Sequence, residues 1–326
     1  MKTEPLLSVR DLRTYFDSEN GPVKAVDGVS FHVNRGKTLA IVGESGCGKS
    51  AANLSILRLL PQPPAYFPSG EIRFGGQDLL RISAKELRAI RGDRISMIFQ
   101  DPMTSLNPFL TVERQLTEVL ETHKGMTSAQ ARKASVEMLG RVGIPDPAVR
   151  IRQYPHEFSG GMRQRAMIAA ALLCEPELLI ADEPTTALDV TVQAQILSLI
   201  DGFRQDLKMG LILVTHDLGI VAGIADRVLV MYAGKVVEEG VVEDIFGEPR
   251  HPYTAGLLKS LPKLKGKRRE RLNPIPGMPP DLSRLPAGCP FAPRCGYATE
   301  RCRTEYPECV EFGVGHKSAC WEAKKL

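Results

Sequence analysis

Eight consecutive residues, Gly43-Glu44-Ser45-Gly46-Cys47-Gly48-Lys49-Ser50, match the pattern G-x-x-x-x-G-K-[ST], the P-loop. The apolar run at 38–42 predicts a buried strand before the loop, and residues 50–60 predict a helix after it that prolines end. The glycines let backbone N–H groups converge on phosphate oxygens at the positive end of the helix dipole. We expect Lys49 to reach the β- and γ-phosphates of a nucleotide and the Ser50 hydroxyl to bind Mg²⁺.

Polar side chains end three apolar runs that predict buried strands, namely Gln100, the pair Asp182 and Glu183, and His216. Such strand ends are where α/β folds gather ligand-binding groups. Two carboxylates at the tip of a buried strand are costly unless each is paired, solvated or used. With a P-loop upstream, Asp182 suits magnesium binding, and Glu183 suits activation of a water for attack on the γ-phosphate.

A second helix start that could bind phosphate lies within a region, 111–175, that is predicted to be mostly helical. Ser159 is a good N-cap, and Gly160 and Gly161 expose backbone N–H groups at the start of a helix expected to run to Leu173. Ordinary helix capping is the alternative interpretation. Two capping boxes are also predicted, at Ser83 and at Thr127.

Alternating strands and helices predict an α/β fold with a mixed, mainly parallel core sheet flanked by helices. An N-terminal antiparallel sheet is expected from residues 6–12, 23–33 and 70–76. Tyr15 and Phe16 lie between the first two of these runs. Either aromatic ring could pack within the sheet or stack on an adenine.

Composition bounds the class of protein. The chain has 326 residues, of which 43% are hydrophobic and 25% charged, and a net charge of +4. The length suggests two domains, and the charge is too small to argue for a nucleic-acid partner. No apolar run is long enough to cross a bilayer, and the N-terminus lacks the apolar core of a signal peptide, so we expect a cytosolic protein.

The C-terminal part changes in composition after about residue 250. A basic run at 263–271 and a proline-rich stretch at 273–288 precede five of the seven cysteines, spaced C-x5-C-x6-C-x6-C-x10-C. A C-x-x-C pair, which zinc ribbons use, does not occur. Four cytosolic thiolates suit a [4Fe–4S] cluster, while zinc and free thiols remain alternatives. We assign no function to Cys47 or Cys174.

Together these motifs resemble the ATP-binding subunit of an ABC transporter over residues 6–245. The resemblance implies an ABC-type P-loop ATPase domain at 1–250, with its helical subdomain at about 101–175 and an extension at 251–326. It assigns the following roles: P-loop for Gly43 to Ser50, adenine stacking for Phe16 with Tyr15 as runner-up, Q-loop and magnesium contact for Gln100, signature motif for Ser159, Gly160 and Gly161, Walker B for Asp182 and Glu183, D-loop for Asp189, and switch histidine for His216. Met162 departs from the glutamine that many members have there.

Finer resemblance points to importers of dipeptides and oligopeptides, through residues 98–108, 181–191 and 251–254. The run Met162-Arg163-Gln164-Arg165 is more similar to the D-type than to the F-type ATPase of these systems. This implies a heterodimer with an F-type ATPase, two membrane permease subunits, a solute-binding protein, and a location on the cytoplasmic face of the membrane. Alternatives are importers of nickel or sugars, an ABC ATPase acting on DNA or the ribosome, and a metal sensor with vestigial ATPase activity.

The family's cysteine pattern, G-C-x-F-x-x-R-C-x-x-A-x3-C followed by H-x-x-x-C, falls on Cys289, Cys295, Cys302 and Cys320. It passes over Cys309, which we interpret as an extra thiol. The resemblance implies that these four cysteines hold a [4Fe–4S] cluster. A structural role for the cluster is expected, because the extension is too short to build a core of its own.

Overall fold

The computed structural model describes residues 4–19, 21–101, 105–186, 189–260 and 275–325. These residues form two compact units, each built from several stretches of chain. The first unit holds residues 4–6, 34–37 and 82–213, and the second holds residues 7–33, 38–81 and 214–325.

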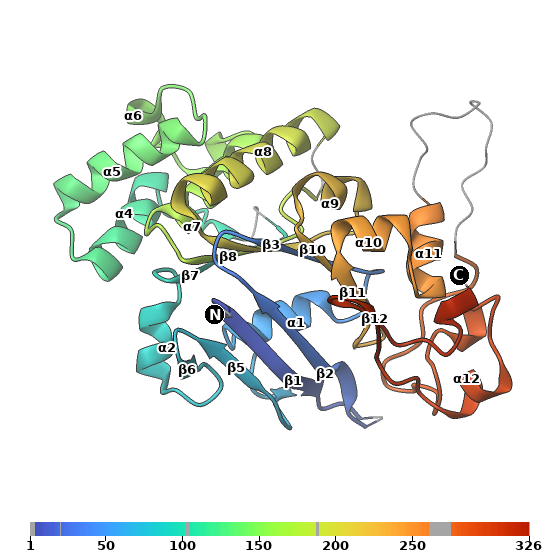
Figure 1. Ribbon diagram of the computed structural model, residues 1–326. Helices are drawn as coiled ribbons and strands as arrows, with labels where there is room; N and C mark the ends of the chain where they lie inside the picture. The colour runs from blue at the N-terminus through green and yellow to red at the C-terminus, as the bar shows by residue number, and fades with distance from the viewer. Residues whose placement is uncertain (1–3, 20, 102–104, 187–188, 261–274, 326) are drawn as a thin grey trace, which may run out of the picture. The chain divides into compact units, whose positions relative to one another are not determined.

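An antiparallel sheet in the second unit has the strand order β2-β1-β5-β6, with β4 also paired to β1 (Figure 1). Its strands are β1 Leu7–Phe16, β2 Val23–Val33, β4 Ala65–Tyr66, β5 Glu71–Phe74 and β6 Gln77–Asp78. The three predicted strands are therefore present. Because β1 is longer than the predicted run at 6–12, Tyr15 and Phe16 belong to the strand rather than to the connection after it.

A second sheet region of the second unit carries the strand that leads into the P-loop. Its strand order is β12-β13-β11-β10-β3, with β10 parallel to β3 and the other pairs antiparallel. The bounds are β3 Thr38–Val42, β10 Arg227–Tyr232, β11 Lys235–Val241, β12 Val310–Gly313 and β13 His316–Ser318. The C-terminal hairpin thus extends the sheet, since β13 pairs with β11.

Helices of the second unit are α1 Lys49–Ile56, α9 Leu218–Ile224, α10 Val242–Gly247, α11 Pro252–Lys259 and α12 Glu300–Thr304, with the short turn η2 at Ala292–Arg294. Helix α1 ends at Ile56, so the prediction that it reaches residue 60 was wrong. Arg58 has φ 49°, in the left-handed region that stops a helix. The Ser55 hydroxyl also donates to the Ala51 carbonyl at 2.6 Å, and such a bond competes with the helix.

The first unit places β7 Ile95–Ile98, β8 Leu178–Asp182 and β9 Gly210–Val214 side by side, with β7 and β8 parallel. Its helices are α2 Ala84–Ile90, α4 Val112–Lys124, α5 Ser128–Arg141, α6 Pro147–Arg150, α7 Gly160–Leu172 and α8 Val190–Leu207 (Figure 1). The predicted helical region is confirmed, as are the capping boxes at Ser83 and Thr127.

All residues of β7, β8 and β9 are buried, as the continuous apolar runs in the sequence predicted. The polar residues that follow these strands are consequently held at the ends of rigid, fully packed elements. Among the described residues, the structure contains no helix that is long and apolar enough to cross a membrane.

Candidate nucleotide-binding site

The P-loop connects β3 to α1 within the second unit. Gly48 is the N-cap of α1 with φ 104°, and α1 begins at Lys49. The Lys49 ammonium is buried and donates to the carbonyl oxygens of Gly43 at 2.7 Å and Glu44 at 3.0 Å. Its positive charge is therefore fixed inside the loop, where a polyphosphate would be attracted to it.

Close packing explains two of the P-loop glycines. A Cβ at Gly48 would collide with the carbonyl oxygen of Ala25 in β2, and one at Gly43 would collide with that of Met231 in β10. Gly46, in contrast, has φ 79° with open space around it, and it lies at the exposed tip with Ser45. The base of the loop is therefore locked against two strands, while its tip remains accessible to a ligand.

Glu44 is bound by the C-terminal part of the chain. Its carboxylate accepts from Arg294 Nη1 at 2.6 Å and from Nη2 at 2.8 Å, and its backbone N–H donates to the Tyr253 hydroxyl at 2.7 Å. Neither Arg294 nor Tyr253 was predicted from the sequence to take part in the nucleotide site. Their presence within the patterns G-C-x-F-x-x-R-C and His-Pro-Tyr was the available signal.

The two candidate aromatic residues for adenine stacking differ in their contacts. The Tyr15 hydroxyl donates to Asp27 at 2.8 Å, and its ring meets Tyr66 edge-on at 5.9 Å. Burial and the Asp27 carboxylate raise the pKa of Tyr15 to about 12. Phe16 is half-buried at the end of β1. Since the structure already uses Tyr15 within the sheet, Phe16 stays the predicted stacking residue.

His216 follows β9 and lies in the same unit as the P-loop. The backbone N–H of Thr215, just before it, donates to the Ile41 carbonyl of β3 at 3.3 Å. Asp217, just after it, caps α9 through a 2.8 Å bond from the Gly219 N–H. The His216 side chain is exposed at this strand end, beside the strand that leads into the P-loop.

Gln100 and Glu183 come together in the first unit. Gln100 Nε2 donates to Glu183 Oε2 at 3.1 Å, and the Thr186 hydroxyl donates to the same oxygen at 2.9 Å. Glu183 has φ 46°, a left-handed conformation that costs a side-chain-bearing residue roughly 1–2 kcal/mol. Asp182 ends β8 and is buried, whereas Glu183 is half-buried. The two carboxylates predicted at this strand end thus lie in different environments.

The predicted signature residues, Ser159, Gly160 and Gly161, lie at the start of α7 in the first unit. The Ser159 hydroxyl accepts from the Met162 N–H at 3.3 Å, which confirms the predicted N-cap. Gly160 is exposed with open space around it, and Gly161 is half-buried. Further along the helix, Gln164 donates to the carbonyl oxygen of Pro184, the residue after Glu183. Helix α7 is thereby tied to the loop that carries the carboxylate.

Asp189 is exposed and caps α8, accepting from the N–H groups of Thr191 at 3.1 Å and Val192 at 3.0 Å. A residue of the predicted D-loop therefore also serves as a helix cap. Residues 187–188 of that loop lie outside the described part of the chain.

Cys289, Cys295, Cys302 and Cys320 all line one small cavity in the C-terminal extension. Cys309 is exposed and lies outside the set of residues that line it. Burial raises the pKa of Cys289 and Cys295, and it raises that of Cys320 to about 12. Within the described parts of the chain, no three His, Cys, Asp or Glu side chains are arranged to hold a metal ion. The cavity brings together the four cysteines that were predicted as cluster ligands, and Cys309 is not among its lining residues.

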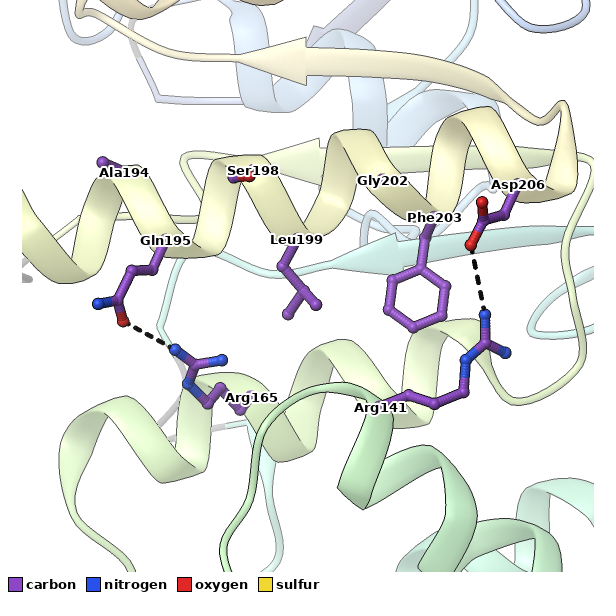
Figure 2. Close-up of a pocket in the computed structure, with 9 residues that line it drawn as sticks. All are labelled: Arg141, Arg165, Ala194, Gln195, Ser198, Leu199, Gly202, Phe203 and Asp206. Atoms are coloured by element: carbon purple, nitrogen blue, oxygen red, sulfur yellow. Dashed lines mark hydrogen bonds and ion pairs between the residues drawn. The ribbon is translucent and has the colours of Figure 1, made fainter.

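A separate groove of about 710 Å³ lies on the first unit, between α7, α8 and the end of α5 (Figure 2). Arg165 donates to Gln195 at 2.9 Å, and Arg141 lies 3.7 Å from Asp206 with its guanidinium over the Phe203 ring. Of the described residues predicted to bind nucleotide, none lines this groove. It is therefore distinct from the predicted site residues of this unit.

Comparison with known proteins gives two family matches along the chain. Residues 26–186 match the model described as ABC transporter, and residues 237–302 match the model for the C-terminal region of oligopeptide/dipeptide transporters. The first match contains the P-loop, Gln100, the signature and both carboxylates. The second contains Tyr253, Arg294 and three of the four cavity cysteines, Cys289, Cys295 and Cys302.

Curated relatives are similar over nearly the whole chain. The dipeptide transport ATP-binding protein DppD of Bacillus subtilis is 56% identical over 98% of this chain and 95% of its own length. The oligopeptide transport ATP-binding protein OppD of Salmonella typhimurium is 51% identical over 97% of this chain and 93% of its own. Among solved structures, a dimeric post-hydrolysis state of the ATP-binding cassette MJ0796 bound to ADP and Pi matches with TM-score 0.65 at 26% identity, covering 72% of this chain and 98% of that one.

The fold and the site residues thus define an ABC-type P-loop ATPase. The chain belongs to the ABC transporter family, in the branch of ATP-binding subunits of oligopeptide and dipeptide transporters.

Proposed function

We propose that this chain is the ATP-hydrolysing subunit of an importer for dipeptides or oligopeptides. The observation that carries the proposal is the fixed carboxylate of Glu183, which Gln100 and Thr186 hold in a strained conformation directly after Asp182. Strain of this kind persists where the surroundings over-determine it, and it is common at functional sites. The names of the relatives, which include dipeptide and oligopeptide transport proteins, support the choice of cargo.

In the proposed reaction, backbone N–H groups of the P-loop and the Lys49 ammonium bind the β- and γ-phosphates of ATP. When Mg²⁺ is bound, Ser50, Asp182 and Gln100 would supply oxygen ligands for it, and the ion would neutralise charge on the phosphates. Glu183 accepts a proton from the attacking water, and His216 contacts the γ-phosphate. Phe16 stacks on the adenine.

Two such chains are proposed to pair head to tail, so that each ATP lies between one P-loop and the signature residues of the partner. The exposed start of α7 supports this arrangement, because Gly160 and Ser159 are accessible. Hydrolysis removes the bridging γ-phosphate, and the pair of chains opens. ATP is thus a ligand that shifts the equilibrium between an open and a closed pair towards the closed state. The proposed partner is an F-type ATPase.

Exposed apolar side chains within ten residues of Gln100 in the sequence support a contact with membrane permease subunits. Phe109 is 87% exposed, Phe99 41% and Leu110 37%. Exposed apolar surface of this kind is typical of protein–protein interaction sites where it forms one patch. We propose that the first unit docks there on the permease at the cytoplasmic face of the membrane. A separate solute-binding protein would then deliver the cargo.

Substitution of Glu183 by Gln tests the reaction. The amide keeps the size of the side chain but cannot take a proton from water, so we expect hydrolysis by the transporter complex to fall at least about 100-fold. ATP binding should be retained and an ATP-bound pair should accumulate on size-exclusion chromatography. Turnover of the Glu183→Gln variant close to that of the wild type would reject Glu183 as the base.

We further propose that the four cysteines around the cavity hold a [4Fe–4S] cluster. Their common cavity and the exclusion of Cys309 from it support this choice of ligands. The test is iron and acid-labile sulfide per chain, after purification without oxygen. We expect Cys302→Ser to lose iron and Cys309→Ser to retain it. Protein without iron or sulfide would leave the nucleotide site unaffected and reject the cluster.

A further inference from the structure

The C-terminal extension contacts the P-loop through a set of residues that the ATPase mechanism does not use. Tyr253 from α11 and Arg294 from η2 both bind Glu44, which is separated from them by 209 and 250 positions in the chain. Both contacts lie within the second unit. The extension therefore encloses the one acidic side chain of the P-loop.

Several hydrogen bonds hold the Arg294 guanidinium beside Glu44. Its side chain is 5% exposed, and besides Glu44 it donates to the Tyr232 hydroxyl at 3.2 Å and to the Pro276 carbonyl at 2.9 Å. Two parallel N–H bonds to one carboxylate are the strongest form of ion pair and fix its orientation. The Glu44 side chain is 25% exposed, so the pair is partly buried, and removal of the arginine would leave the carboxylate charge uncompensated beside the P-loop.

An aromatic cluster includes Tyr253 itself and contacts Arg294, the two residues that bind Glu44. The rings of Tyr232, Tyr253 and Phe291 pack together with centroids 4.6 to 5.4 Å apart, and all three are buried. Phe291 also lines the cavity that holds the four thiols. Because η2 lies between Cys289 and Cys295, the same short segment supplies the arginine and part of the cavity.

We propose that the extension positions the P-loop for ATP, with Arg294 and Tyr253 as positioning residues that act through Glu44. Arg294 keeps the Glu44 carboxylate turned away from Lys49 and neutralises its charge. Tyr253 fixes the backbone N–H of Glu44, whose carbonyl oxygen in turn holds the Lys49 ammonium. Without Arg294, the carboxylate would compete with ATP for Lys49 and repel the phosphates. The inference rests on ATP as the ligand of the P-loop.

The test is the Kd of the full-length chain for Mg-ATP, measured by titration calorimetry. We expect Arg294→Gln to raise Kd about tenfold, since it leaves an unneutralised carboxylate beside a polyphosphate. Arg294→Lys, which keeps the charge but not the paired bonds, should give a smaller increase. The control is Arg303→Gln in the same extension, where the exposed arginine lies 3.9 Å from Glu300; its Kd should stay within about twofold of the wild type.

A double variant separates positioning from a merely structural role. If Arg294 acts by neutralising Glu44, then Glu44→Gln combined with Arg294→Gln removes the repulsion and should restore much of the affinity lost in Arg294→Gln. Damage to the extension itself would not be repaired by a change at Glu44. Equal Kd values for Arg294→Gln and the wild type, or no recovery in the double variant, would overturn the inference. Failure of the wild type to bind Mg-ATP would instead reject the proposed function.

Discussion

The chain contains two glycine-rich helix starts that could bind phosphate, and they are built differently. The base of the P-loop is closely packed, because Gly43 and Gly48 lie against backbone carbonyl groups of β10 and β2. Lys49 at its end is buried. The start of α7 is exposed, and a Cβ at Gly160 would meet open space. The P-loop is therefore a closely packed binding loop, whereas the start of α7 is an exposed helix N-terminus.

This difference fits the proposed division of labour between them. A loop that binds ATP within its own chain gains affinity when its N–H groups are fixed in advance, because less order is lost on binding. A signature motif that completes the site of a partner chain has to remain accessible until the two chains close. Glycine is therefore required for packing at Gly48, and we expect it to be needed at Gly160 for the close approach of a ligand.

The largest expected effect comes from adding one methyl group to each helix start. Gly48→Ala would force a Cβ against the Ala25 carbonyl at φ 104°, so we expect a loss of about 3 kcal/mol or more in the free energy of unfolding, and no ATP binding. Gly160→Ala meets no neighbour and should leave the free energy of unfolding within about 1 kcal/mol of the wild type. Urea denaturation and Mg-ATP titration would measure both.

Gly160→Ala should nevertheless lower hydrolysis by the assembled transporter at least about tenfold, since the new methyl group would stand where the nucleotide of the partner approaches. The matched pair of variants thus separates stability from activity. Equal destabilisation by the two substitutions would contradict the distinction between a packed and an open helix start.

A smaller effect is expected at Ser159, which both caps α7 and is proposed to contact the nucleotide of the partner. Ser159→Ala removes the acceptor for the Met162 N–H and should lower the free energy of unfolding by about 1 kcal/mol. Ser159→Thr keeps a capping hydroxyl and should lose less. If hydrolysis by the complex falls no further than this loss of stability explains, Ser159 is a cap and nothing more.

Local signals in the sequence were sufficient for the parts of the fold that depend on neighbouring residues. The capping boxes at Ser83 and Thr127, the N-cap at Ser159 and the buried core strands are present as predicted, because their causes lie within a few positions of chain. The predicted end of α1 was wrong, because the helix stops before the prolines, where Arg58 adopts a left-handed conformation.

Contacts between distant parts of the chain could not be predicted in this way. The bond between Arg294 and Glu44 joins residues 250 positions apart, and the pairing of β13 with β11 brings the C-terminal hairpin into the sheet. The local sequence around Arg294 does not indicate that its partner is Glu44, and the local sequence of β13 does not indicate that its neighbour is β11. The pairing of Gln100 with Glu183 was more accessible, because both residues end parallel neighbouring strands.

The smallest expected effect is at Met162, where many ABC ATPases have glutamine. Met162 contributes to the cap of α7 through its backbone N–H, which donates to the Ser159 hydroxyl. This bond does not depend on the Met162 side chain. We therefore expect Met162→Gln to change the free energy of unfolding by less than about 0.5 kcal/mol, and to keep hydrolysis by the assembled transporter within about twofold of the wild type. A tenfold change in hydrolysis without a change in stability would mean that this side chain touches the nucleotide of the partner, and that the open helix start recognises its ligand through more than its serine and glycines.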